Sequence, residues 1–386
     1  MLRTLAVDNY RSLRSIIVPL GRLNVVAGPN GSGKSNLYRS LRLLAETAAG
    51  GIVSSLAREG GLDSSFWAGP EKLSREMRAG RVPVQGTRRN NPVRLKLGFW
   101  GDEFGYSITM GLPPPSESAF ALDPEIKREC IWSGPVCKAE SILVDRQGPS
   151  VRVRTDNGWR TVADGLSLFE SIFTQIADPN NAPEVFLLRE TIRGWRFYDQ
   201  LRTDTDAPCR IPRLGTLTPV LGHDGGDLAA AIQTIIELGD PKAVADAVDS
   251  AFPGARVNIV RQGDSRFSVE LQQPGLLRSL SATELSDGTL RFLLWLAALL
   301  TPRPPSLMVM NEPENSLHPD LLPALSQLIV KAAKNTQVWV VTHSPELIAA
   351  LRKDSETRMI ELEKELGQTQ VKGQNLLDRP AWRWLD

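Results

Sequence analysis

Cysteine is scarce in this chain of 386 residues, which contains only Cys130, Cys137 and Cys209. Three scattered thiols are too few for a disulfide framework or for a zinc site with four ligands. Such thiols are expected to stay reduced, as they do in the cytosol. The sequence therefore excludes a small disulfide-stapled domain and predicts a cytoplasmic protein.

Excess charge and long apolar runs are missing too. The 45 basic and 44 acidic residues give a formal net charge of +1. That balance excludes a protein that coats nucleic acid by bulk charge, although it leaves room for a local basic patch. No segment reaches the roughly 18 uninterrupted apolar residues of a membrane span, and the N-terminus lacks the basic-then-apolar order of a signal peptide. We therefore expect no membrane partner.

The pattern of the remaining residues predicts an α/β fold. Short all-apolar strands are expected at residues 23–26, 307–310 and 338–341. Helical spacing of apolar residues predicts helices that begin near Asn36, Ser286, Pro319 and Pro345. All-apolar strands that alternate with helices are typical of a parallel sheet covered on both faces.

The middle of the chain has a different texture. Alternation at residues 93–99 and 106–110 predicts a hairpin, and further short strands are expected at 141–144 and 151–154. The pattern then becomes helical, and a second hairpin is expected at residues 257–271. One helical face is marked by Leu166, Phe169, Ile172, Phe173 and Ile176, and another by Leu228, Ile232, Ile235 and Ile236.

The strongest chemical signal is the run GPNGSGKS at residues 28–35, which fits the P-loop pattern G-x-x-x-x-G-K-[ST], or Walker A motif. Glycines let the backbone curl so that its N–H groups point at phosphate oxygens, and the next helix presents its positive end to the same anion. Lys34 is expected to reach the β- and γ-phosphates, and Ser35 to ligate Mg²⁺. An apolar strand before the loop and a helix after it are the context that this motif requires.

Two apolar strands deliver polar residues at their ends. The first leads into Asn311 and Glu312, where a carboxylate is placed to accept a proton from an attacking water molecule. The second leads into His343, which is placed to donate to a γ-phosphate. Each residue has a plainer interpretation: Glu312 as an acidic helix cap before Pro313, and His343 as a cap of the following helix.

The run LSDGT at residues 285–289 opens a long predicted helix. Ser286, the Gly288 backbone and the helix N-terminus together make another anion site. Taken alone, the same residues are simply an N-cap followed by a helix.

In their order along the chain, the P-loop, LSDGT, the strand ending in NEPE and the strand ending in TH resemble the ATP-binding-cassette (ABC) class of ATPases. Within it, DNYRSL at residues 8–13, GPNGSGKSN at 28–36 and EPENSLHP at 312–319 are most similar to RecF- and SMC-like ATPases of AAA type. That branch is a stand-alone relative of the OLD family without the nuclease domain. The resemblance covers residues 1–48 and about 280–350 well.

The resemblance implies a P-loop ATPase that dimerises around two ATP molecules with Mg²⁺. Glu312 would then be the general base and His343 the γ-phosphate sensor, and Ser316-Leu317-His318 would touch the partner subunit. The nucleotide would be held by Gly28, Asn30, Gly31, Ser32, Gly33, Lys34, Ser35 and Asn36 of one subunit and by the signature residues Ser286 and Gly288 of the other. The metal would be held by Ser35 and Asn311.

One position departs from the family pattern. The acid that usually precedes the catalytic glutamate is replaced by Asn311. An amide oxygen still accepts from a metal-bound water, but it lacks the negative charge. We therefore expect weak Mg²⁺ affinity or slow turnover.

Residues 1–48 and 280–386 are expected to form a split ATPase core with a mixed sheet. Residues 49–165 would be an antiparallel, β-rich part of the head, and 166–279 a mainly helical insertion with a C-terminal hairpin. No heptads occur between the halves, so a coiled coil is not expected. Arg189, Arg193 and Arg196 beside Trp195 suggest either a grip on a nucleic-acid backbone or a solvated helix face.

Several functions remain open at this stage. An ATPase switch in DNA repair, genome maintenance or anti-phage defence, with DNA as a candidate ligand, fits the motifs. Because the chain has no space for a nuclease domain beyond His343, a nuclease or toxin activity would come from a partner. A nucleotide-gated scaffold with very slow hydrolysis is the alternative that Asn311 suggests. A transporter nucleotide-binding subunit fits less well, because such subunits rarely carry so long an insertion.

Overall fold

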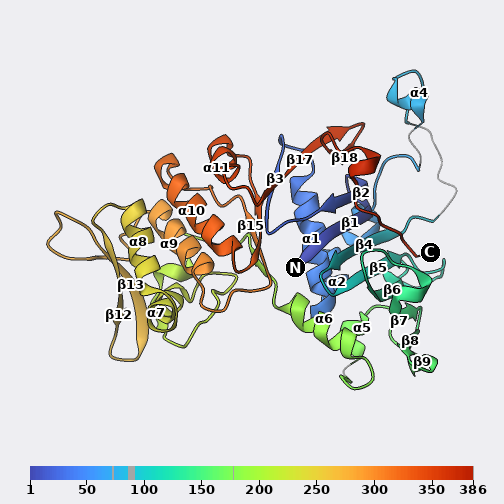
Figure 1. Cartoon of the computed structure of the whole chain (residues 1–386), viewed down its shortest axis with the longest axis horizontal. Helices are drawn as coiled ribbons and strands as arrows, with labels where there is room; N and C mark the ends of the chain where they lie inside the picture. Colours follow the sequence, from blue (N-terminus) through green and yellow to red (C-terminus); the bar gives the residue numbers. More distant parts are fainter. Residues whose placement is uncertain (72–73, 86–91, 177, 386) are drawn as a thin grey trace. The chain divides into compact units, whose positions relative to one another are not determined.

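The computed structural model describes residues 1–71, 74–85, 92–176 and 178–385, and it divides into two compact units (Figure 1). The first unit holds residues 1–20, 28–194 and 360–386, and the second holds 21–27 and 195–359. Parts of the expected ATPase core thus occur in both units. No helix among the described residues is long and apolar enough to cross a membrane.

The first unit is built on an antiparallel sheet with the strand order β2-β1-β4-β5-β6-β7-β8-β9. Strand β8 alternates buried and more exposed residues, whereas β1 and β5 are buried along most of their length. The C-terminal strands β17 (Thr357–Glu365) and β18 (Gln368–Val371) form a hairpin. The sheet strands are β1 (Leu2–Tyr10), β2 (Leu13–Pro19), β4 (Leu95–Gly101), β5 (Phe104–Gly111), β6 (Glu125–Ser133), β7 (Ile142–Gln147), β8 (Ser150–Thr155) and β9 (Gly158–Ala163).

Helix α1 (Lys34–Ala49) is the principal helix of this unit, and it buries Leu37, Leu41 and Leu44 at the predicted spacing. It packs against α2, α5 and α6. The remaining helices are α2 (Ile52–Arg58), α3 (Gly61–Ser65), α4 (Arg75–Arg78), α5 (Ile172–Gln175) and α6 (Pro183–Arg193), with short 3-10 turns η1 (Ala139–Ser141) and η4 (Leu376–Asp378).

The second unit is built on a parallel ladder with the order β10-β15-β16-β3. Asn311 of β15 pairs with Val341 of β16, which pairs with Val26 of β3. The three strands therefore end at one edge. The parallel strands are β3 (Leu23–Ala27), β10 (Arg196–Tyr198), β15 (Leu307–Asn311) and β16 (Gln337–Val341).

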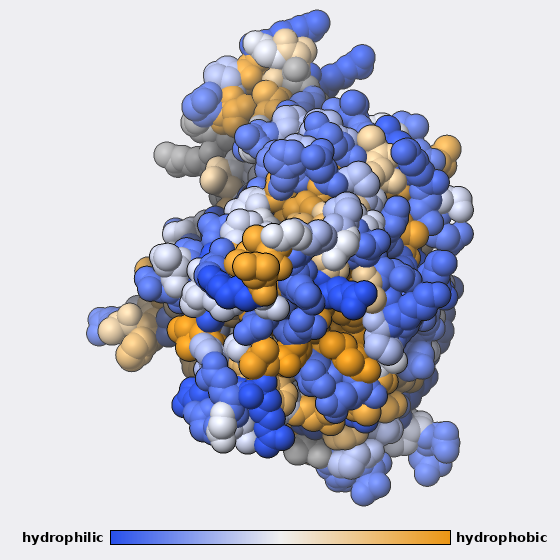
Figure 2. Space-filling view, turned by 90° about the vertical axis from the view of Figure 1, so that its left-hand side faces the viewer, coloured by the Kyte–Doolittle hydropathy of each residue, from blue (hydrophilic) through white to orange (hydrophobic). Residues whose placement is uncertain are grey.

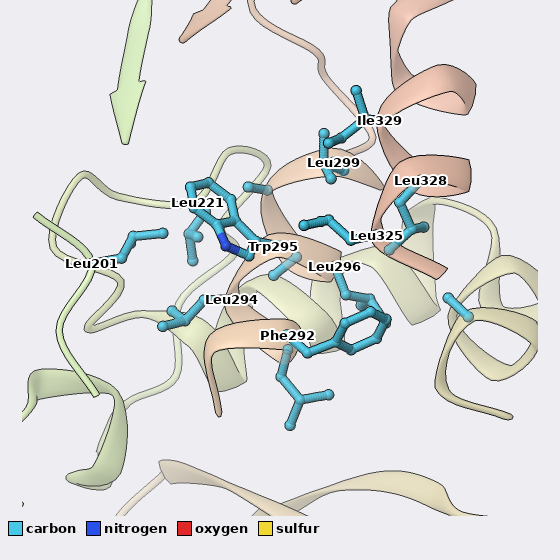
Figure 3. Packing of buried hydrophobic residues seen from close by; sticks show 14 of the residues in the cluster. Leu201, Leu221, Phe292, Leu294, Trp295, Leu296, Leu299, Leu325, Leu328 and Ile329 are labelled. Atoms are coloured by element: carbon cyan, nitrogen blue, oxygen red, sulfur yellow. The ribbon is translucent and has the colours of Figure 1, made fainter. Parts of the chain in front are cut away.

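Helices of the second unit bury a core in which α9 is central. Figure 3 shows Phe292, Leu296 and Leu299 of α9 close to Leu325 and Ile329 of α10. A small sheet with the order β11-β13-β12 adds a further layer, and β14 pairs with β13. These elements are α7 (Leu228–Leu238), α8 (Pro241–Ala251), α9 (Asp287–Leu299), α10 (Leu322–Ala333), α11 (Pro345–Leu351), η2 (Pro208–Arg210), η3 (Pro319–Leu321), β11 (Arg213–Leu214), β12 (Arg256–Arg261), β13 (Arg266–Gln272) and β14 (Leu280–Ser281).

On the face shown in Figure 2, hydrophilic side chains predominate and apolar side chains gather in patches. Figure 2 faces the side on which β12, β13 and α8 lie in Figure 1. Exposed large apolar residues of the second unit include Leu214, Leu217 and Leu277. Scattered apolar residues of this kind are normal on protein surfaces.

The expected α/β class is confirmed, and the strands at 23–26, 307–310 and 338–341 form as predicted. The helical face over residues 166–176 is wrong, because only α5 (Ile172–Gln175) is helical there. The cause is a buried polar network. The Arg146 guanidinium donates to the carbonyl oxygens of Ser167 (2.6 Å) and Glu170 (2.6 Å). These carbonyl oxygens point to Arg146 instead of accepting helical hydrogen bonds.

Glu129 and Arg146 are register partners on β6 and β7, and their side chains are fully buried. They form an ion pair of 2.7 Å. Glu129 also accepts hydrogen bonds from the hydroxyls of Tyr106 (2.7 Å) and Ser171 (2.6 Å) and from the backbone N–H of Ile172 (3.0 Å). Burial, then the Glu129 charge, raises the pKa of Tyr106 well above its usual value, so its hydroxyl stays a donor.

We expect Arg146→Met to lower the free energy of unfolding by about 3–5 kcal/mol, because it leaves the buried Glu129 carboxylate without its counter-charge. Arg152→Met is the control, since its side chain is 43% exposed in its ion pair with Asp145 and should cost less than about 1 kcal/mol. Urea unfolding of both variants measures the difference. Equal stabilities of the two variants would contradict a role for the buried pair.

Candidate functional site

The P-loop follows directly from β3 and leads into α1. Gly28, Gly31 and Gly33 all have positive φ angles, which residues other than glycine rarely adopt. At Gly33 a Cβ atom would lie 2.1 Å from the Thr369 hydroxyl oxygen. Glycine is therefore required there both by its backbone conformation and by close packing.

Lys34 and Asn36 hold the loop from inside. Lys34 is 7% exposed, and its ammonium donates to the carbonyl oxygens of Gly28 (2.7 Å) and Pro29 (3.1 Å). The Asn36 amide donates to the Ser12 hydroxyl at 2.8 Å. Asn30 and Gly31 are exposed at the tip of the loop. The cation is thus placed within the turn that the motif is expected to wrap around phosphate.

The chemistry of the loop fits an anion. Helix α1 has 16 residues, its N-cap residue Gly33 offers no side chain as a cap, and its first turn holds no acidic residue. Its positive end is therefore uncompensated by its own side chains. The Ser32 hydroxyl is buried and has no hydrogen-bond partner among the described residues. The Ser35 side chain is exposed at the start of α1, as a metal-ligating hydroxyl requires.

Two residues that sequence reasoning did not assign support the loop. The Thr369 hydroxyl, from β18, donates to the carbonyl oxygen of Ser32 at 2.8 Å and lies 2.7 Å from the Ser12 hydroxyl. Ser12 belongs to the DNYRSL run, so its neighbourhood carried a signal. Thr369 lies far along the chain in an unremarkable hairpin, and nothing in its sequence context points to the P-loop.

Glu312 follows β15 in a left-handed conformation with φ of 48°. Such a conformation is energetically costly in a residue other than glycine, and residues that adopt it are often found at functional sites. The Glu312 N–H still donates to the Val341 carbonyl oxygen at 2.7 Å, which ties it to the end of β16. One carboxylate oxygen accepts from the Asn315 amide at 2.8 Å. Asn311, the last residue of β15, is half-buried beside it.

His343 stands beside Glu312. Its Nδ1 lies 3.6 Å from a Glu312 carboxylate oxygen and 3.5 Å from a Glu314 oxygen. The side chains of His343 and Glu312 are 48% and 36% exposed, so both are open to a ligand. Both residues thus meet at one end of the ladder, where β3 also ends and continues into the P-loop.

The segment LSDGT at residues 285–289 is held in place by contacts of its own. Ser286 is the N-cap of α9, since its hydroxyl accepts from the Thr289 N–H at 3.2 Å. At Gly288 a Cβ atom would lie 2.9 Å from the Ser316 carbonyl oxygen, so α9 approaches the segment after Glu312 closely. The Trp295 indole, further along α9, donates to the Pro313 carbonyl oxygen at 3.0 Å.

Arg210 is another residue that sequence reasoning missed. It is 8% exposed, and it donates to the carbonyl oxygens of Ala282 (2.8 Å) and Leu285 (2.9 Å) and to the Asp287 carboxylate (2.7 Å). One buried guanidinium therefore fixes both sides of Ser286. No local pattern predicts this, because Arg210 lies in the intervening region.

The arginine segment around Trp195 does not offer the stacking surface that a grip on nucleic acid requires, the first of the two interpretations of this segment. Trp195 is 3% exposed. The guanidinium of Arg189 lies over the Phe186 ring at 5.2 Å, and Arg193 donates to the Ala48 carbonyl oxygen at 3.0 Å. Because stacking on a base requires an exposed ring, this segment lacks one half of the nucleic-acid grip.

Known proteins resemble the chain in sequence and in structure. A family model described as "AAA domain, putative AbiEii toxin, Type IV TA system" matches residues 23–99 and 172–349. An OLD nuclease from Thermus scotoductus is 46% identical over 44 residues, which are 11% of this chain and 8% of that protein. The chain thus matches only a small part of that relative.

Solved structures resemble the fold over nearly its whole length. An Smc head bound to the C-winged helix domain of ScpA gives a TM-score of 0.51 at 12% identity, and the match covers 97% of this chain and 98% of that one. An Smc head domain with an extended coiled coil, derived from Pyrococcus furiosus and bound to the C-terminal domain of ScpA, gives 0.49 at 11% identity, with 96% and 95% covered.

The likeness to the first of these heads confirms the predicted P-loop ATPase fold. The family model covers more than half of the residues, in two segments separated by residues 100–171. Together with the short OLD match, it confirms the predicted AAA-type ATPase with a relation to the OLD family. The chain therefore belongs to the AAA-domain family whose description names AbiEii-type toxins and type IV toxin–antitoxin systems.

Proposed function

We propose that the chain binds ATP with Mg²⁺ at its P-loop and hydrolyses it with Glu312 and His343. Membership of a P-loop ATPase family implies nucleotide binding, usually with Mg²⁺. The observation that carries the proposed hydrolysis is the pairing of Glu312 with His343, 3.6 Å apart, at the edge where β15, β16 and β3 end. Parallel α/β sheets place their ligands at this edge.

Binding would rest on charge and on backbone donors. The loop 28–33 and the N-terminus of α1 would cradle the phosphates, and Lys34 would turn its ammonium from the loop carbonyls to the phosphate oxygens. Ser35 and Asn311 would hold Mg²⁺, which supplies charge neutralisation when bound. A hydroxyl and an amide oxygen are hard donors, as this cation requires.

Hydrolysis would need a base and a positioned donor. Glu312 would accept a proton from the attacking water through the carboxylate oxygen that Asn315 does not hold. His343 presents Nδ1 to the two carboxylates, so its other ring nitrogen is directed away from them. We propose that this nitrogen donates to the γ-phosphate. Both side chains are partly exposed, which leaves room for the substrate.

A second copy of the chain would complete the site. Ser286 and Gly288 lie at the N-terminus of α9, a helix of 13 residues whose positive end suits a γ-phosphate. We propose that these residues of one subunit cap the nucleotide held on the P-loop of the other. Dimerisation is typical of SMC-like ATPases.

The cellular role would be exerted through a partner. The family description names a toxin–antitoxin system, and the short match is to an OLD nuclease. We propose that ATP-driven dimerisation acts in DNA repair, genome maintenance or anti-phage defence, with a nuclease or toxin as the effector. ATP turnover with and without double-stranded DNA tests DNA as a ligand.

Asn311 favours a second candidate function, a nucleotide-gated scaffold that hydrolyses ATP very slowly. The amide in place of a carboxylate removes one negative charge from the proposed metal site. In this case the bound state itself would be the signal, and turnover would only reset it.

We expect Lys34→Ala to weaken ATP binding by about 10- to 100-fold, because it removes a charge-assisted contact to the phosphates. Arg39→Ala is the matched control, since Arg39 is an exposed cation on the same helix and should leave the affinity unchanged. Titration calorimetry with ATP and Mg²⁺ measures both. If both variants bind ATP as the natural chain does, the P-loop is not the nucleotide site.

We expect Glu312→Gln to reduce ATP turnover by about 100-fold or more, because the amide cannot accept the proton. Since this substitution keeps the size of the side chain, ATP binding should persist and the ATP-bound dimer should accumulate. Turnover assays and light scattering after gel filtration measure the two effects, with Glu237→Gln on the exposed face of α7 as control. Equal, near-zero turnover of the natural chain and Glu312→Gln would favour the scaffold.

We expect Asn311→Asp to lower the Mg²⁺ concentration needed for half-maximal turnover by about tenfold, since it restores a negative charge beside the metal. Turnover measured across a Mg²⁺ titration checks this. An unchanged titration curve would mean that Asn311 does not set the metal affinity.

A further inference from the structure

Glu314 is the most deeply placed acid near the ladder's edge. Its side chain is only 9% exposed. One carboxylate oxygen, Oε1, accepts from the Thr342 hydroxyl (2.5 Å) and from the backbone N–H groups of His343 (3.1 Å) and Ser344 (3.2 Å). Three donors on consecutive residues thus converge on a single oxygen.

These contacts join the exits of two strands. Glu314 follows β15 by three residues, whereas Thr342 directly follows β16. The backbone before Glu314 is itself fixed, because the Pro313 carbonyl oxygen accepts from the buried Trp295 indole. The contact from α9 therefore fixes the backbone beside Glu314, and the Glu314 carboxylate in turn fixes the turn that carries His343.

The cost of this arrangement indicates that it is retained for a reason. The second carboxylate oxygen, Oε2, is buried and has no hydrogen-bond partner among the described residues. A buried acceptor that stays unpaired is destabilising. The turn also has a cap independent of Glu314, since the Ser344 hydroxyl accepts from the Leu347 N–H at 3.2 Å. The N-cap of α11 therefore does not depend on a carboxylate at position 314.

We propose that Glu314 is a positioning residue that fixes the Thr342–Ser344 turn and so holds the His343 imidazole beside Glu312. This inference rests on the proposed function, in which Glu312 and His343 act on the same nucleotide. The 3.5 Å from His343 Nδ1 to Glu314 Oε1 and the 3.6 Å to Glu312 place the ring between the two acids. Glu314 acts through His343 and does not touch the substrate.

Two substitutions separate the hydrogen bonds from the charge. Glu314→Gln keeps a carbonyl oxygen where Oε1 lies, so the three donors remain satisfied. Glu314→Ala removes the acceptor altogether. We therefore expect kcat to fall by about 10- to 100-fold in Glu314→Ala and to stay within about threefold of the natural value in Glu314→Gln, with the Kd for ATP unchanged in both. Glu346→Gln is the matched control, because Glu346 is an exposed acid just past the same turn.

A double-mutant cycle with His343→Ala tests whether Glu314 acts through His343. The loss caused by Glu314→Ala should shrink to within about twofold when His343 is already absent. The same loss in both backgrounds would overturn the proposal, since it would show a general structural role. Retention of full kcat by Glu314→Ala in the natural background would overturn it as well.

Hydrogen exchange tests the contact between Glu314 and the His343 and Ser344 amides in the absence of ATP. The amides of His343 and Ser344 should exchange about tenfold faster in Glu314→Ala than in the natural chain and near the natural rate in Glu314→Gln. Unchanged exchange in Glu314→Ala would overturn the positioning role even if ATP is hydrolysed. Absence of turnover in the natural chain would overturn the proposed function alone, because faster exchange in Glu314→Ala would still establish the Glu314 contact.

Discussion

The parallel pairing of β15, β16 and β3 is the constraint on which the candidate site depends. In a parallel ladder every strand ends at the same edge, and the register Asn311–Val341–Val26 aligns the three exits. Glu312 and His343, which lie far apart in sequence, meet because their strands are neighbours. The P-loop starts from the third exit. The pairing of the strands thereby brings together residues from segments that are distant in the sequence.

Packing beneath the ladder converts this alignment into fixed positions. Helix α9 is apolar on nearly all sides and is buried in the core, and the Trp295 indole reaches from it to the Pro313 carbonyl oxygen. That contact holds the backbone directly after Glu312, which has a costly left-handed conformation. A strained backbone conformation persists only where several contacts hold it in place. Here those contacts come from the buried core around α9.

Sequence patterns predicted the parts of the site that are local. The P-loop, the three all-apolar strands and the N-cap at Ser286 are each specified by residues within about ten positions, so periodicity and motif spacing reveal them. Sequence did not reveal Thr369, Arg210 or the role of Glu314. Their contacts join segments that are distant along the chain or depend on the conformation of a turn. The wrong helical face at 166–176 has the same origin, because the buried Glu129–Arg146 pair overrides a local preference.

The missed residues share one physical feature: each presents a buried polar group to backbone atoms of a motif. Thr369 donates to Ser32, Arg210 to residues on both sides of Ser286, and Glu314 accepts from His343 and Ser344. A contact to backbone fixes a loop whatever side chains the loop carries, so motif and support can vary separately. Since a buried polar group left unpaired is costly, each loop is also driven into a narrow range of conformations. Loops held in this way bring their side chains to a ligand already oriented, and preorganisation of that kind is what proton abstraction and phosphate binding both require.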